Sequence, residues 1–199
     1  MIILLRHGRV LDGKGLCLGR TDAPLSPDGK DQARKVADEL EGIPFARLCS
    51  SPAARTRATL HPLAERLGLE VETLPALAEI DMGKWDGLDF ETIRQRYPAE
   101  YAERGKCLGR YRVPGGESFE DVADRAMETL TELARGPMPV LAATHAGVIR
   151  TVLCRVTGHP LDDLFHFTPG YARCTLLRAD GTFELVGEDV FARTVRELL

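Results

Sequence analysis

Residues 2–8 read Ile-Ile-Leu-Leu-Arg-His-Gly, an apolar run that ends in two basic side chains and a glycine. Four consecutive apolar residues predict a strand that is buried on both faces, as in a parallel sheet. In open α/β sheets, ligands bind beyond the carboxyl ends of the strands. We therefore expect Arg6 and His7 to lie at the ligand-binding edge of such a sheet.

Residues 140–147, Val-Leu-Ala-Ala-Thr-His-Ala-Gly, repeat this arrangement, with His145 after the strand and a helix opening at Gly147. A weaker strand candidate, residues 46–50, leads into a helix that carries Arg55 near its start. These segments would gather two imidazoles, two guanidiniums and free helix N-terminal amides at one edge. Guanidiniums and helix N-termini favour phosphate dianions, so the pattern predicts a phosphate-binding site.

The remainder of the chain alternates between helical and strand periodicities, which predicts an α/β fold. We expect a three-layer sandwich with a mainly parallel sheet, helices on both faces and an antiparallel edge strand. The edge strand follows from a hairpin signal, Asp180-Gly181 between apolar runs. The other predicted elements are helices opening at Pro27, Pro52, Phe90 and Ser118, and a short strand over residues 69–73.

A length of 199 residues fits one domain, and a hydrophobic content of 44% is sufficient for a sizeable core. The segment 81–114 is less periodic and rich in charge and glycine. It is expected to hold one helix, about residues 90–95, which is broken before Pro98. We interpret 81–114 as a lid-like insertion, within a single domain spanning 1–199, that sets substrate specificity.

The composition argues against several classes of partner and site. A net charge of −4 disfavours nucleic acid or an anionic membrane as the main partner. No window approaches the roughly 18 apolar residues of a membrane span, and the N-terminal apolar stretch is too short for a signal peptide. Five cysteines without a CxxC pair or zinc spacing fit a reducing compartment, so we expect a cytoplasmic protein.

Five motifs follow one another along the chain. They are Leu-Arg-His-Gly at 5–8, a Gly-Arg-Thr-Asp segment at 19–26, Ser-Ser-Pro-Ala-Ala-Arg at 50–55 followed by Thr59, an acidic motif around Glu79 at 77–87, and Thr-His-Ala-Gly-Val-Ile-Arg at 144–150. Together they resemble the histidine phosphatase superfamily, which includes cofactor-dependent phosphoglycerate mutases. The resemblance covers nearly the whole chain, and the shared order of the motifs makes it specific.

The resemblance implies a phosphatase that acts on a small phosphorylated metabolite and needs neither a metal ion nor a cofactor. His7 would be the nucleophile, with its second ring nitrogen donating to a backbone carbonyl. Arg6, Arg55 and His145 would neutralise the oxygens of the transferring phosphoryl group. Glu79 would protonate the leaving alcohol and then help water to attack the phosphohistidine. The expected substrate-binding residues are Arg6, Gly19, Arg20, Arg55, His145 and Ala146.

The sequence departs from the family pattern close to His7. Val10 stands where many members carry threonine or serine, and Asp12 with Gly13 stands where an asparagine often follows. A hydroxyl contact to the phosphate is therefore not expected at this position. This departure weakens the interpretation of the chain as a mutase.

The compact length and the segments 17–22 and 114–118 resemble the α-ribazole phosphatase branch, which acts in assembly of the cobalamin nucleotide loop. The alternatives left open are a phosphoserine or sugar-phosphate phosphatase, a cofactor-dependent phosphoglycerate mutase and a non-enzymatic module that binds a phosphorylated ligand. Arg110 and Arg112 in the insertion are candidates for contacts with the rest of the substrate. A homodimer is also left open.

Two rival chemistries have weaker support in the sequence. Cys49 to Arg55 matches the Cys-x5-Arg outline of a cysteine-dependent phosphatase loop, but Pro52 lacks an amide there and the loop holds no glycine. A dinuclear metal hydrolase would need clustered ligands. The five histidines show no HxH, HD or HExxH spacing, so we expect no metal site.

Overall fold

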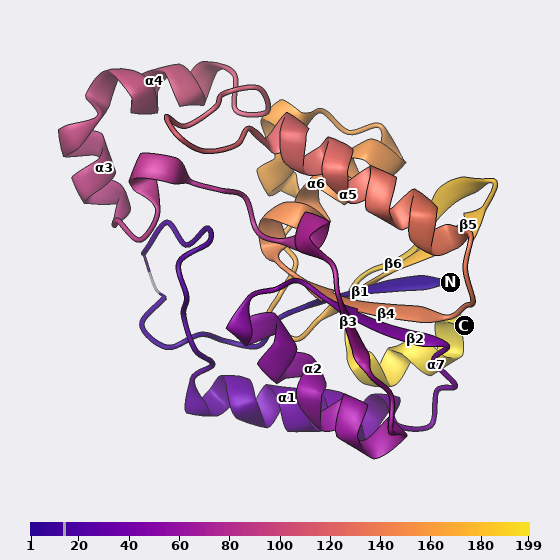
Figure 1. The fold of residues 1–199 in the computed structure, drawn as a ribbon. Helices are drawn as coiled ribbons and strands as arrows, with labels where there is room; N and C mark the ends of the chain where they lie inside the picture. Colours follow the sequence, from indigo (N-terminus) through magenta and orange to yellow (C-terminus); the bar gives the residue numbers. More distant parts are fainter. Residues whose placement is uncertain (14) are drawn as a thin grey trace.

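The computed structural model describes residues 1–13 and 15–199, which are built around one mixed sheet (Figure 1). Its strands are β1 Ile2–Arg6, β2 Arg47–Ser50, β3 Val71–Thr73, β4 Val140–Thr144, β5 Cys174–Asp180 and β6 Thr182–Val190. They lie in the order β3-β2-β4-β1-β5-β6. The first four strands, β1 to β4, are parallel to one another, whereas β5 pairs antiparallel with β1 and β6 pairs antiparallel with β5. This confirms the predicted mainly parallel sheet with an antiparallel edge.

Helices cover both faces of the sheet and give the three predicted layers (Figure 1). They are α1 Pro27–Leu40, α2 Ala54–Leu67, α3 Phe90–Arg96, α4 Pro98–Lys106, α5 Phe119–Ala134, α6 Ala146–Thr157 and α7 Val195–Leu198. On one face, Ile3 and Leu5 of β1 share a core with α1, α2 and α7. On the other face, Ile2 and Leu4 share a core with α5 and α6. This double burial explains why the strand is continuously apolar.

Local hydrogen bonds set where the first helices begin. The Ser26 side chain accepts from the Gly29 backbone N–H and so caps α1, as the sequence predicts. α2 begins at Ala54, two residues later than the predicted start at Pro52. The reason is that the backbone of Ala53 is still extended and acts as the N-cap position.

The segment 81–114, which was predicted to be an insertion, contains two α-helices, α3 and α4, instead of the single predicted helix, and a short 3-10 helix at Gly83–Trp85. Pro98 was expected only to break a helix, but it also occupies the first position of α4, where its missing N–H is not needed. Trp85, Ile93 and Val113 are buried in the same core as α5 and α6. This segment therefore packs onto the rest of the fold, with α3 and α4 beyond the end of the sheet (Figure 1).

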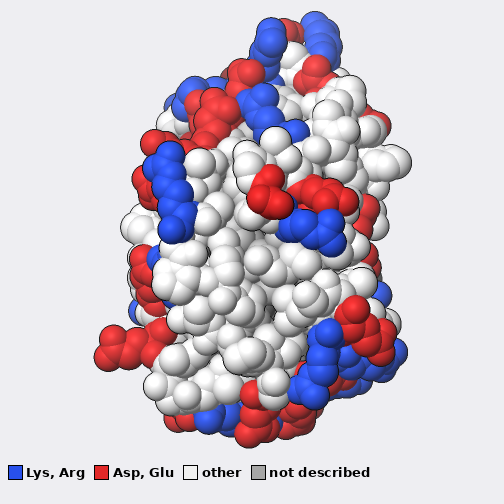
Figure 2. Space-filling view, turned by 90° about the vertical axis from the view of Figure 1, so that its right-hand side faces the viewer, with Lys and Arg blue, Asp and Glu red and all other residues white. Residues whose placement is uncertain are grey.

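The face at the amino end of β1 carries mixed charge (Figure 2). Lys and Arg side chains are interspersed with Asp and Glu around a broad area without charged side chains. On this face, neither the basic nor the acidic side chains form a large continuous patch. None of the helices within residues 1–13 and 15–199 is both long enough and apolar enough to cross a membrane.

Candidate active site

Two histidines stand side by side at the carboxyl ends of β1 and β4. These strands are parallel neighbours, with Arg6 opposite Thr144 in the register. The His7 backbone N–H donates to the Thr144 carbonyl over 3.0 Å. The imidazoles of His7 and His145 meet edge to face, with ring centroids 5.2 Å apart. The structure thus brings together the two strand-end histidines that were predicted to share one edge of the sheet.

The His7 ring is held in one tautomer by its own loop. Nδ1 lies 2.8 Å from the Gly8 carbonyl oxygen, so Nδ1 carries the hydrogen and donates it. Gly8 is fixed in turn because its backbone N–H donates to Thr59 Oγ1. Burial is the main reason that the pKa of His7 falls to about 3, and the charges of Arg55 and Arg6 act in the same direction. The ring is therefore neutral, and its Nε2 keeps a free lone pair.

Two largely buried guanidiniums accompany the histidines. Arg6 donates through Nη1 to the Pro169 carbonyl over 2.6 Å and lies 3.8 Å from the centre of the Tyr171 ring. Arg55, only 2% exposed, donates to two backbone carbonyls of the segment 19–21. Burial lowers the pKa of both guanidiniums. Their hydrogen-bond partners in the described part of the chain are carbonyl oxygens rather than carboxylates, which leaves their charge available to an anion.

The Glu79 carboxylate reaches the site from the turn that follows β3. One oxygen accepts from the Ile80 N–H and the other from the Gly147 N–H at the start of α6, each over 3.0 Å. A Cβ at Gly147 would collide with this carboxylate, which explains the glycine. Arg125 of α5 donates to the carbonyls of Glu79 and Ala76. Hydrogen bonds from α5 therefore fix the backbone of the turn that carries Glu79.

His145 is fully buried and bonded to a residue whose role the sequence analysis missed. Its Nε2 lies 2.8 Å from Ser51 Oγ, whereas its Nδ1 has no partner among the residues that the structure describes. Burial, followed by the charges of His7 and the arginines, lowers the pKa of His145 well below its usual value. Ser51 belongs to the 50–55 motif, but its contact joins residues 94 positions apart and only the folded sheet creates it.

The predicted site residues line two adjoining cavities. A cavity of about 460 Å³ is lined by Gly19, Arg20, Arg55, Glu79 and His145. A smaller one of about 210 Å³ is lined by Arg6, His7, Arg55, Glu79 and Ala146. Because Arg55 and Glu79 belong to both linings, the two cavities form one cleft.

Three other predicted arginines are engaged with carboxylates. The half-exposed Arg20 guanidinium lies 3.4 Å from each of two side chains, Asp81 and Glu117. Arg110 and Arg112 pair with acidic residues of α5 and are absent from the lining of both cavities of the cleft. Their positions therefore do not support the prediction that Arg110 and Arg112 contact the substrate.

Tyr171 and Arg104 line the smaller cavity, and neither was singled out from the sequence. The Tyr171 ring centroid lies 5.7 Å from that of His7. The Arg104 guanidinium lies 6.0 Å from the Trp85 ring and 5.8 Å from the Phe119 ring, and burial lowers its pKa. Tyr171 lies in the irregular loop that precedes β5, and Arg104 lies on α4. Their approach to the site depends on tertiary packing that no local pattern indicates.

The thiol chemistry considered from the sequence has no support in the site. Cys49 is buried in the core, with Sγ 3.8 Å from a Glu72 carboxylate oxygen. Burial, and then the charge of Glu72, raises the pKa of this thiol to about 12. The thiolate that a cysteine-dependent phosphatase needs would therefore not form near neutral pH.

Comparisons with known proteins agree with this geometry. A profile of the Histidine phosphatase superfamily (branch 1) matches residues 2–186. A 6-phosphofructo-2-kinase/fructose-2,6-bisphosphatase of Caenorhabditis elegans is 36% identical over 167 residues, which are 82% of this chain and 35% of that protein. The human 6-phosphofructo-2-kinase/fructose-2,6-bisphosphatase 1 is 35% identical over 178 residues, 88% of this chain and 35% of that protein. The chain thus spans about a third of the length of these relatives.

Solved structures share the whole fold. The mycobacterial glucosyl-3-phosphoglycerate phosphatase has a TM-score of 0.84 at 26% identity, covering 95% of this chain and 98% of that one. A putative α-ribazole-5′-P phosphatase from Escherichia coli has a TM-score of 0.85 at 21% identity, covering 96% and 97%, a likeness that shows the fold alone. From the matched profile and the sequence relatives, the chain belongs to the histidine phosphatase superfamily, branch 1.

Proposed function

We propose that this protein is a phosphomonoesterase that transfers the phosphoryl group of its substrate to His7 and then to water. The observation that carries the proposal is the contact of 2.8 Å between His7 Nδ1 and the Gly8 carbonyl oxygen, which places the ring hydrogen on Nδ1 and leaves Nε2 as the nucleophile, while burial lowers the pKa of the ring. Two guanidiniums without carboxylate partners in the described residues lower its pKa further and would receive the anionic phosphate. A nitrogen nucleophile beside fixed positive charge suits attack on a phosphate ester.

In the first step, His7 Nε2 attacks phosphorus and the bond from phosphorus to the alcohol oxygen breaks. Arg6 and Arg55 hold the phosphoryl oxygens, so the negative charge of the transition state meets positive charge that is already in place. Glu79, in its protonated form, gives its proton to the leaving alcohol. The products of this step are the free alcohol and a phosphohistidine.

His145 acts in this scheme as a neutral hydrogen-bond donor. Its lowered pKa leaves one hydrogen on the ring. When the Ser51 hydroxyl donates to Nε2, that hydrogen resides on Nδ1, the nitrogen that lacks a partner in the described residues. Nδ1–H would then donate to a phosphoryl oxygen without adding a charge that needs burial.

In the second step, water attacks the phosphohistidine. The Glu79 carboxylate accepts a proton from this water, the P–N bond breaks, and the electron pair returns to Nε2 of His7. Inorganic phosphate leaves, and the starting protonation states are restored. A solved structure of the mycobacterial phosphatase with inorganic phosphate, 26% identical to this chain, supports phosphate as the ligand of such a site.

The residues that line the smaller cavity indicate which class of substrate the site would accept. Arg104 lines it and has no carboxylate within ion-pair distance among the residues that the structure describes. A partly buried guanidinium of this kind favours a substrate whose alcohol part carries a second anionic group. The substrates named for relatives, fructose 2,6-bisphosphate and glucosyl-3-phosphoglycerate, have such a group. We therefore place phosphorylated sugars and sugar acids first.

α-Ribazole 5′-phosphate is the second candidate. The smaller cavity is also lined by four aromatic residues that would pack against a heterocyclic base, Phe90, Phe119, Phe165 and Tyr171. The mutase alternative is weaker, because Val10 lines this cavity and provides no hydroxyl to hold a phosphate.

A comparison of kcat/KM values tests the proposal. The panel comprises p-nitrophenyl phosphate, fructose 2,6-bisphosphate, glucosyl-3-phosphoglycerate, phosphoserine and α-ribazole 5′-phosphate, each with wild type, Arg104→Met and the control Arg110→Met. Preference for the sugar phosphates, lost in Arg104→Met only, would support the first substrate class. Preference for α-ribazole 5′-phosphate in wild type would favour the second. No turnover of any ester would contradict the phosphatase and support a binding module.

A further inference from the structure

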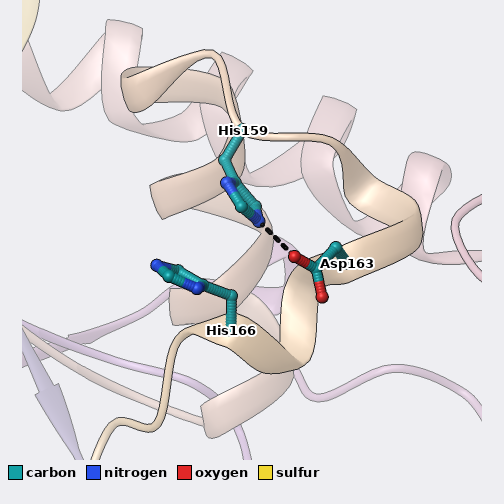
Figure 3. Close-up of side chains that lie close together, drawn as sticks. All are labelled: His159, Asp163 and His166. Atoms are coloured by element: carbon teal, nitrogen blue, oxygen red, sulfur yellow. Dashed lines mark hydrogen bonds and ion pairs between the residues drawn. The ribbon is translucent and has the colours of Figure 1, made fainter.

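His159, Asp163 and His166 form a cluster that the proposed reaction does not use (Figure 3). They belong to the turn that follows α6, at the spacing His-x3-Asp-x2-His. This spacing is not one of the metal-binding patterns considered in the sequence, and the expectation of no metal site rested on those patterns alone. None of the three residues lines the cavities of the cleft, so the cluster is separate from the catalytic centre.

The donor atoms already lie close together. His159 Nε2 is 3.0 Å from Asp163 Oδ2, and one donor atom from each residue lies within 4.8 Å of the other two. A tetrahedral Zn²⁺ ion with bonds near 2.0–2.2 Å needs its ligand atoms about 3.4 Å apart. The longest separation in the cluster must therefore contract by no more than roughly 1.4 Å. The exposed side chains of Asp163 and His166 are free to make this change by rotation.

A buried ring keeps the two imidazoles near each other. Phe167, 5% exposed, meets His159 edge to face at 5.3 Å and His166 edge to face at 5.1 Å. The imidazoles themselves are stacked, with centroids 4.6 Å apart. Asp163 lies beside the two rings (Figure 3), at a non-helical point of the turn with φ −117° and ψ 31°. The arrangement therefore depends on the packing of the turn and not only on three solvated side chains.

We propose that His159, Asp163 and His166 bind one divalent transition-metal ion of the zinc type, with water in the remaining position. Two imidazole nitrogens and one carboxylate oxygen suit Zn²⁺, Co²⁺ or Ni²⁺, whereas Mg²⁺ and Ca²⁺ prefer oxygen ligands alone. On binding, the ion takes the place of the hydrogen now shared between His159 Nε2 and Asp163. The alternative is a plain ion pair between a histidine and an aspartate four residues apart.

The site has a structural connection to the cleft. Phe165, next to His166, lines the smaller cavity, and so does Arg150. The Arg150 guanidinium donates through Nε to the Phe167 carbonyl over 2.9 Å and lies 5.0 Å from the Phe165 ring. A metal ion that fixes this turn would therefore fix one wall of the cavity. Given the proposed phosphatase activity, bound metal should lower KM and leave kcat unchanged.

Cobalt titration provides the test. The titration uses the full chain with the substitution Cys107→Ser, which removes a thiol that could bind Co²⁺. Cys107 is partly exposed, whereas the other four cysteines are buried. One equivalent of Co²⁺ should produce the visible absorption of a four-coordinate site, and Zn²⁺ should displace it. Asp163→Asn and His166→Gln should each weaken binding by more than about tenfold. His61→Gln on α2 is the matched control, since His61 forms a similar pair with Glu65 and should have no effect.

Two results would overturn the metal site. One is an absorption that persists in a variant carrying both Asp163→Asn and His166→Gln. The other is an absorption that disappears in His7→Ala, because the ion would then lie between the active-site histidines. Metal binding does not depend on the phosphatase proposal, so it can be established even when no ester is turned over. A KM that does not respond to bound Zn²⁺ would contradict the connection to the cleft.

Discussion

The Ser51 hydroxyl at the end of β2 lies 2.8 Å from Nε2 of His145 at the end of β4. β2 and β4 are parallel neighbours, with Ser50 opposite Ala143 in the register. Both side chains therefore follow their strands at the same edge of the sheet. Each histidine of the site has one nitrogen held by one partner, the Gly8 carbonyl for His7 and the Ser51 hydroxyl for His145. In the proposed reaction, the other nitrogen of each ring faces the phosphoryl group.

Ser51→Ala should lower kcat by about tenfold or more, because His145 is then free to place its hydrogen on Nε2 instead of Nδ1. Loss of the buried hydrogen bond should also reduce the free energy of unfolding by about 1 kcal/mol. The matched control is Ser50→Ala, which removes an equally buried hydroxyl that donates to the Ser51 carbonyl. Equal losses of kcat in the two variants, measured by steady-state kinetics, would argue against control of the tautomer.

Glu79→Gln should lower kcat for an alkyl phosphate by about 10²–10³-fold, since the glutamine cannot protonate the leaving alcohol. The first step with p-nitrophenyl phosphate should be less affected, because nitrophenolate leaves without a proton. Single-turnover release of the two alcohols measures this difference. A loss that is the same for both leaving groups would contradict the role of Glu79 as the acid.

Gly147→Ala should reproduce the effect of Glu79→Gln. The added Cβ would meet the Glu79 carboxylate and displace it from the site. Gly105→Ala is the control, because its Cβ would enter open space on α4. Release of the two alcohols is compared as before, and a Gly147→Ala variant with wild-type rates for both esters would show that the position of Glu79 is unimportant.

The burial of His7 should make the fold sensitive to acid. An unfolded histidine has a pKa near 6.5, whereas the pKa of His7 in the folded protein is about 3. Between these values the unfolded chain binds more protons, so the free energy of unfolding falls as the pH drops below about 6.5. From about pH 7.5 to about pH 5.5, one such histidine accounts for a loss of about 1.4 kcal/mol.

His7→Gln should therefore reduce this acid-dependent loss by about 1.4 kcal/mol, as measured by urea denaturation at the two pH values. The exposed His61 offers the comparison, because His61→Gln should leave the loss unchanged. If the free energy of unfolding falls between the two pH values by the same amount in both variants and in wild type, the His7 ring is not held neutral in the folded protein.

The strand-end residues could be predicted because their signals are local. The apolar runs before Arg6 and before Thr144 are long enough to indicate buried parallel strands, and parallel strands necessarily present their carboxyl ends together. The signal of the edge hairpin is also local. Asp180-Gly181 indicates a turn, and Gly181 has the positive φ, +73°, that this turn requires.

Other features depend on contacts that no local pattern encodes. Ser51 gains its role only when β2 pairs with β4. Tyr171 gains its role only when the backbone of the next residue, Ala172, hydrogen-bonds to the carboxyl end of β1. α4 was missed because a proline was read as the end of a helix, although it also suits the first position of one. Arg104 lies on this missed helix, and its approach to the cleft was missed with it.

The phosphoenzyme is the most direct test of the proposed chemistry. Wild type and His7→Gln are mixed with radiolabelled p-nitrophenyl phosphate, quenched within one turnover and digested for peptide mapping. The account predicts a label that is stable in alkali and labile in acid, lies on the peptide containing His7, and is absent from His7→Gln. A label on another residue such as Cys49, or undiminished turnover by His7→Gln, would contradict it.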